Sequence, residues 1–153
     1  MITIVRRIAL GVLAASLSLC AADMLSGTWK LNTAKSKYSP GPAPKSTTIT
    51  YSMDGDWVVM KIDAVTADGK PASFSNRYKF DGKEHPYKTP NLDGTISAKR
   101  IDDMHTEAAI KGGKAHGTSH TVISKDGKTR TLTTTGTNAE GKPVKNVAVY
   151  DKQ

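Results

Sequence analysis

The sequence predicts an all-β domain, an antiparallel up-and-down meander of about 8–10 strands closed into a barrel. Two observations predict this fold. Glycine-containing turn signals recur every 12 to 19 residues, and the segments between them are rich in Thr, Val, Ile and Tyr with one apolar face. No segment repeats its apolar residues at helical spacing. Closure into a barrel removes the two long open edges that such a meander would otherwise leave.

The first 22 residues are predicted to be a signal peptide, which leaves one domain at residues 23–153. Arg6 and Arg7 precede an apolar run of twelve residues, 8–19. That run is shorter than the roughly 20 residues of a membrane-spanning helix. We therefore expect a periplasmic or secreted protein without a transmembrane span. The alternative of a lipid anchor at Cys20 is less favoured, because Leu19 fits poorly before a lipidated cysteine.

The composition of the mature chain excludes several classes of site. Its lack of cysteine excludes a disulfide, a thiol nucleophile and a thiolate metal site. Without Arg6 and Arg7 the formal net charge falls from +8 to +6. The lysines are spread along the predicted hairpins, which indicates a solvated surface. We therefore expect a monomer that does not bind nucleic acid.

The predicted turns divide the mature chain into nine strands. The turn signals are Asp54-Gly55, Asp68-Gly69, Asp81-Gly82, Asp93-Gly94, Asp102-Asp103, Gly112-Gly113, Asp126-Gly127 and Glu140-Gly141. The expected strands are 26–32, 46–53, 57–66, 72–80, 95–101, 104–111, 115–124, 128–137 and 144–151. A short tenth strand at 84–88 is weakened by Pro86. Residues 33–45 contain three prolines and predict an extended or Ω-type loop.

The two ends of the domain resemble those of the calycins, the lipocalins and fatty-acid-binding proteins. Gly27-Thr28-Trp29 is similar to their Gly-x-Trp signature, and residues 147–152 are similar to the last strand of fatty-acid-binding proteins. The chain also resembles short exported bacterial proteins described as lipocalin-like. The resemblance implies a ligand-binding barrel with Trp29 plugging its closed end.

Two departures from that resemblance bear on the ligand. Fatty-acid-binding proteins carry a helix–turn–helix lid where this chain has the proline-rich loop 33–45. They hold the ligand carboxylate with the Arg of an Arg-x-Tyr motif, and the matching positions here are Ala148 and Tyr150. We therefore do not expect a fatty acid in the usual pose.

The sequence favours an exported protein that binds a small hydrophobic or amphiphilic ligand inside the barrel. The candidate cavity residues are Val58, Met60, Ile62, Phe74, Tyr78 and Phe80, with Arg100 and Tyr150 as polar contacts. Such a ligand needs a void of at least about 300 Å³. The alternative is a cavity-free interaction module of the cell envelope that acts through the proline-rich loop or a sheet edge.

Three further side chains leave alternatives open. Arg100 shares a face with Ile96 and Ala98, so it either faces a ligand head group or extends to solvent. For Arg130, which shares a face with Leu132, extension to solvent is favoured. Trp57 is either an exposed binding aromatic or a strand-end residue.

No pattern in the sequence supports catalysis, a cofactor or a bound metal. There is no nucleophile elbow, Walker loop, dinucleotide fingerprint or His-Glu-x-x-His motif. His116 and His120 are four residues apart on a predicted strand, which separates their Cα atoms by roughly 13 Å. That separation is too large for both to bind one zinc ion. We therefore expect no enzyme activity, cofactor or metal site.

Overall fold

The computed structural model describes residues 23–153, so the predicted signal peptide lies outside the described residues. In the described part, no helix is long and apolar enough to cross a membrane. The elements are β1 (Gly27–Leu31), η1 (Thr33–Lys35), β2 (Ser46–Asp54), β3 (Trp57–Val65), β4 (Pro71–Lys79), β5 (Asp81–Thr89), β6 (Leu92–Arg100), β7 (His105–Gly112), β8 (Ala115–Ile123), β9 (Thr129–Thr137) and β10 (Pro143–Lys152).

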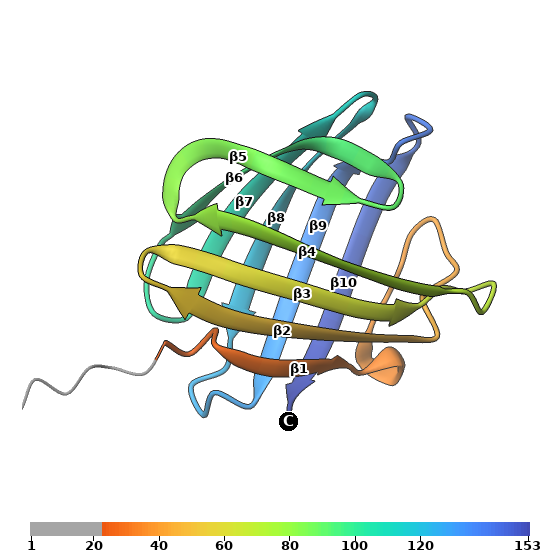
Figure 1. Ribbon diagram of the computed structural model, residues 1–153. Helices are drawn as coiled ribbons and strands as arrows, with labels where there is room; N and C mark the ends of the chain where they lie inside the picture. Colours follow the sequence, from red (N-terminus) through yellow and green to blue (C-terminus); the bar gives the residue numbers. More distant parts are fainter. Residues whose placement is uncertain (1–22) are drawn as a thin grey trace, which may run out of the picture.

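All ten strands form one antiparallel sheet that curls into a nearly closed barrel. The hydrogen-bonded order is β4-β3-β2-β1-β10-β9-β8-β7-β6-β5. In Figure 1, β1 to β4 cross the front while β7 to β10 run steeply behind them. The strands at the two ends of the order, β4 and β5, are consecutive in the chain and lie side by side. The predicted all-β up-and-down barrel is therefore confirmed. We call the boundary between β4 and β5 the seam.

The turn predicted at Asp93-Gly94 is wrong, and the turn predicted at Asp81-Gly82 lies one residue earlier, at Phe80, so that Asp81 and Gly82 begin β5. The chain reverses at Pro90-Asn91, and Asp93-Gly94 lies inside β6 instead of joining two strands. At Gly94 a Cβ atom would collide with the backbone of Lys111 and Gly112 on β7. Glycine is therefore needed at this position because β6 and β7 approach closely. In the sequence, a glycine required for close strand approach cannot be distinguished from a glycine required for a turn.

The weak strand predicted at 84–88 is instead the full nine-residue strand β5. On an antiparallel strand, alternate residues direct their N–H and C=O groups toward the same side. The N–H and C=O of Lys88 face the seam, where they bond the Asn76 side chain, so the nitrogen of Pro86 faces the seam as well. Because Pro86 lies on an edge, its missing N–H removes no bond from the ladder.

Residues 23–26 lie across one end of the barrel. Trp29 is fully buried, and its indole Nε1–H donates to the carbonyl oxygen of Leu25 at 2.8 Å. The ammonium group of Lys152 lies 5.0 Å from the Trp29 ring and donates to the carbonyl of Met24 at 3.2 Å. The N-terminal segment, β1 and β10 thereby complete the core at this end.

The proline-rich loop lies beside β10. Lys37 forms a β-bridge with Val147, and the N–H of Ser39 donates to the Asn146 side-chain oxygen at 3.0 Å. The loop thus continues along β10 beyond the short strand β1, which pairs with β10 only through residues 29–31.

Candidate functional site

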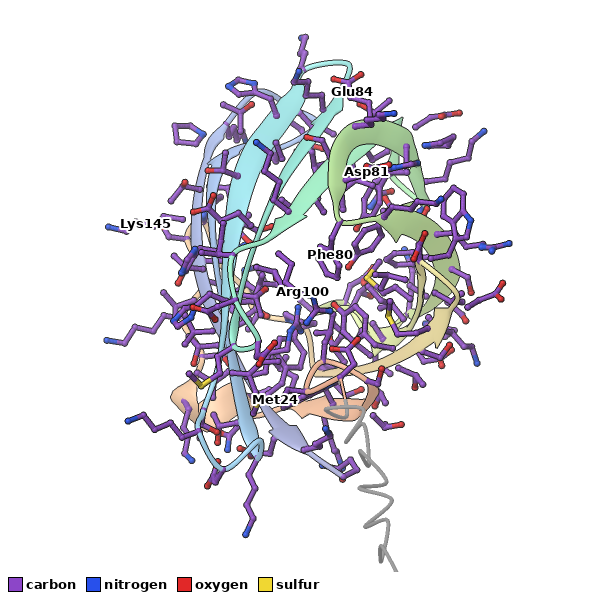
Figure 2. The ribbon with its side chains drawn as sticks, turned by 90° about the vertical axis from the view of Figure 1, so that its left-hand side faces the viewer. Met24, Phe80, Asp81, Glu84, Arg100 and Lys145 are labelled. Atoms are coloured by element: carbon purple, nitrogen blue, oxygen red, sulfur yellow. The ribbon has the colours of Figure 1, made fainter. Side chains whose placement is uncertain are left out.

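The barrel encloses a small interior void of about 100 Å³. Of the predicted cavity residues, Met60, Ile62, Tyr78 and Phe80 line it. Figure 2 shows Phe80 in the space between the two sides of the barrel. The void falls below the roughly 300 Å³ at which ligand pockets begin, so its residues must move to admit a ligand of ordinary size.

The other predicted cavity residues do not border the void. Val58 and Tyr150 are buried in the core, and Phe74 is half-buried on β4. Arg100 lies below Phe80 in Figure 2, with its guanidinium 4.7 Å from the Phe80 ring. Its Nη2 lies 3.1 Å from Oδ1 of Asp23. Its charge is thus paired within the chain, and ligand contact by Arg100 stays a prediction.

The interpretation of Arg130 as a solvent-seeking side chain is wrong. Arg130 is only 3% exposed and lines the void. Its guanidinium lies between two tyrosine rings, 5.0 Å from Tyr51 and 5.1 Å from Tyr150. Nη2 donates to the hydroxyl of Tyr51 at 2.9 Å, whereas Nε and Nη1 have no acceptor among residues 23–153. A buried cation with two unpaired donor nitrogens therefore lies at the wall of the void.

The hydroxyl groups near Arg130 are held in the neutral form. Burial, with a smaller contribution from the nearby Tyr51 side chain, raises the pKa of Tyr87 to about 12. Burial likewise raises the pKa of Tyr78 and Tyr150, partly offset by the positive charge of Arg130. At neutral pH the lining of the void therefore contains the buried Arg130 cation, the uncharged hydroxyls of Tyr78 and Tyr87, and the solvent-exposed carboxylate of Glu107, which leaves Arg130 as the only buried charge in that lining among the described residues.

These tyrosines predict a loss of stability at alkaline pH. A tyrosine whose folded pKa lies above its unfolded value of about 10 contributes stability that is complete below about pH 10. The contribution is lost as pH rises toward the folded pKa, by about 1.4 kcal/mol per pH unit for each group. We expect denaturant titrations to show the free energy of unfolding falling steeply between about pH 10 and 12. Tyr87→Phe should reduce the dependence of the free energy of unfolding on pH by about 1.4 kcal/mol per pH unit, the contribution of one titrating group. An unchanged pH dependence would contradict the burial of the Tyr87 hydroxyl.

A larger hollow, of about 440 Å³, lies on the outer face of β6 to β9. Its charged groups are Lys99, Glu107 and His120, and the His120 and Glu107 side chains are 3.5 Å apart. These side chains are solvent-exposed and can satisfy their polar groups with water, unlike Arg130. Residues 23–153 contain no group of three His, Cys, Asp or Glu side chains placed to hold a metal ion. The interior void beside Arg130 is therefore the candidate site.

Three solved structures of low sequence identity share this architecture. A Schistosoma mansoni fatty acid binding protein in complex with arachidonic acid superposes with a TM-score of 0.64 at 18% identity, covering 85% of this chain and 96% of that chain. The fold is that of the fatty-acid-binding proteins. The wild-type fluorescent protein UnaG gives a TM-score of 0.58 at 18% identity over 84% of this chain and 96% of that chain.

A third similar structure is the zebrafish ileal bile-acid-binding protein complexed with cholic acid. Its TM-score is 0.52 at 18% identity, over 85% of this chain and 99% of that chain. No protein-family model matches the sequence, and no curated protein matches it. The resemblance to the calycins is thus confirmed at the level of the fold. Where fatty-acid-binding proteins have their helical lid, this barrel has the single turn η1 and an extended loop.

Proposed function

We propose that this protein is an exported binding protein for a small amphiphilic molecule whose anionic head group pairs with Arg130. The observation that carries the proposal is the pair of free donors on the buried guanidinium, Nε and Nη1. Each unpaired buried donor costs about 1–3 kcal/mol. An anionic head group that accepted a hydrogen bond from either nitrogen would form a charge-assisted bond, which is stronger than a bond between neutral groups.

The position of Arg130 supports a head-group site different from the Arg-x-Tyr site of fatty-acid-binding proteins. Arg130 pairs directly with Tyr150 across the β9–β10 ladder. It therefore supplies a guanidinium next to the strand on which Ala148 replaces the usual arginine. Two of the similar structures hold an acid, arachidonic or cholic, which supports an acidic ligand.

The small volume of the void limits the size of the apolar part of the ligand. About 100 Å³ accommodates only about three water-sized groups, since water occupies about 30 Å³ in the liquid. A longer apolar tail must displace side chains, and the flexible Met60 is suited to such movement. The small void is also the observation that favours the second candidate, a cavity-free interaction module of the cell envelope.

A head-group series tests the proposal. Straight-chain carboxylic acids, alcohols and amines of matched length, from short to long, are titrated against the protein by calorimetry. We expect each acid to bind at least about tenfold more tightly than its alcohol, because hydrogen bonds to a charged group contribute about 1.5–3 kcal/mol. Binding by no acid of any length, with no molecule retained in native mass spectra of protein from its own host, would favour the interaction module.

Export is supported by the charged start and apolar run of residues 1–22. Cleavage after Ala22 would make Asp23, the partner of Arg100, the first residue of the mature protein. Intact-mass measurement of the secreted or periplasmic protein checks this boundary.

A further inference from the structure

The seam is the section of the barrel wall without a backbone ladder. Every other pair of neighbouring strands in the sheet order is joined by paired residues. Within residues 23–153, no such pairing joins β4 to β5. Pro86 faces the seam without an N–H and so hinders any full ladder from forming there.

One side chain bridges the seam. The Asn76 carboxamide donates through Nδ2 to the carbonyl oxygen of Lys88 at 2.9 Å. The N–H of Lys88 donates back to Oδ1 of Asn76 at 2.8 Å. Asn76 is 7% exposed, so these two bonds are shielded from water. The Asn76 carboxamide thus takes the place of the backbone hydrogen bonds that would otherwise join β4 to β5.

The bridge separates an outer groove from the interior void. The groove, of about 340 Å³, is lined by Trp57, Ser75, Asn76, Arg77, Pro86 and Lys88. Asn76 belongs to the inward-facing set of β4, yet the groove reaches it from outside. On the inner side, Tyr78 and Tyr87 line the void. Tyr78 lies two residues after Asn76 on β4, and Tyr87 directly precedes Lys88 on β5. The Asn76–Lys88 bridge, with Tyr78 and Tyr87 behind it, therefore belongs to the wall between the groove and the void.

The groove has the chemistry to receive an amphiphilic anion. Trp57 is half-buried, with the Arg77 guanidinium 5.0 Å and the Lys79 ammonium 4.8 Å from its ring. Arg77 and Lys88 form ion pairs with Asp54 and Asp93, at 2.9 and 3.0 Å. Both pairs are solvent-exposed and therefore weak, so the two cations can exchange partners with an incoming anion.

We propose that the seam is the ligand entrance and that Asn76 is its latch, an inference that rests on the proposed binding function. Breaking the two Asn76–Lys88 bonds lets β4 and β5 part, which joins the groove to the void and enlarges the space beside Phe80. The anion passes from the cations of the groove to Arg130, and the carboxamide bridge then re-forms behind it.

Asn76→Ala tests the latch against a matched control, Asn146→Ala, which removes the carboxamide that holds the proline-rich loop. Stopped-flow fluorescence with anilinonaphthalene sulfonate, an anionic aromatic probe, gives both rate constants. We expect Asn76→Ala to raise the association and dissociation rates by about tenfold, with less than about a twofold change in the dissociation constant, because a gate alters passage in both directions. Asn146→Ala should alter neither rate.

Faster binding in Asn146→Ala alone would place the entrance at the loop and overturn the proposal. Hydrogen exchange of the ligand-free protein provides a second readout that does not depend on binding. In Asn76→Ala, exchange should accelerate at Lys88 and its neighbours on β4 and β5 only. An unchanged Lys88 amide, or acceleration throughout the barrel, would reject the latch. Local acceleration in a protein that binds no probe would leave the latch intact and reject the binding function.

Discussion

Replacing Arg130 with methionine is expected to raise the free energy of unfolding by about 1–3 kcal/mol and to remove the preference for acids over alcohols. The guanidinium is buried with Nε and Nη1 unbonded among residues 23–153. Methionine fills a similar volume without a charge or buried donors. Functional residues commonly lower the stability of a protein. The increase in the free energy of unfolding would measure how much Arg130 destabilises the native protein. Denaturant titration and the head-group series measure the two effects.

Arg100→Met is the matched control for this change. Arg100 is paired with Asp23, so its removal leaves a partly buried carboxylate without its partner. The free energy of unfolding should therefore fall, and the preference for acids over alcohols should weaken far less than in Arg130→Met, because the charge of Arg100 is already paired. If Arg130→Met were instead destabilising and still selected acids, Arg130 would be a structural residue and the proposed head-group site would be wrong.

Trp29→Ala is expected to lower the free energy of unfolding by about 3–5 kcal/mol, the largest loss we predict for a single side chain. The fully buried indole packs in the core beneath residues 23–26 and bonds the Leu25 carbonyl. Domains of this kind have only about 5–15 kcal/mol in total, so the variant should melt far below the native protein. Thermal and denaturant unfolding check the loss.

Two further variants separate the contributions of Trp29. Trp29→Phe keeps an aromatic ring but loses the bond to Leu25, and should cost about 1 kcal/mol from that bond. Trp57→Ala removes the half-buried tryptophan of the outer groove and should cost about 1 kcal/mol. Equal losses for Trp29→Ala and Trp57→Ala would contradict the central place of Trp29 in the core.

The architecture was predictable because its signals are local. Alternation along a strand and glycine-marked reversals depend on neighbouring residues, and they predicted the order and direction of nine strands. The errors arose at residue types, glycine and proline, that can have more than one structural role. Gly94 permits close strand approach in place of a turn, and Pro86 is tolerated within β5 because that strand forms an edge. Neither role can be assigned before the neighbours across the sheet are known.

The candidate site was less predictable because its chemistry depends on the register between strands. Arg130 lies among threonines in a segment with one apolar neighbour on its face, which suggested extension to solvent. Its burial follows from Tyr51 and Tyr150, which are distant in sequence and lie on either side of its guanidinium. The Asn76–Lys88 bridge likewise joins two edges that only barrel closure brings together. The one available signal was the register of the last hairpin, which places Arg130 directly opposite the inward-facing Tyr150.

The pairing of β1 with β10 has a consequence for how the protein reaches its native state. Trp29 is opposite Lys152, a partner more than a hundred residues later in the chain. The barrel can therefore close only after its last strand has been synthesised, and contacts this distant make folding slow, on the scale of milliseconds to seconds. The proposed export of this chain would depend on such a delay, because a polypeptide that is still open can be threaded across a membrane before it folds.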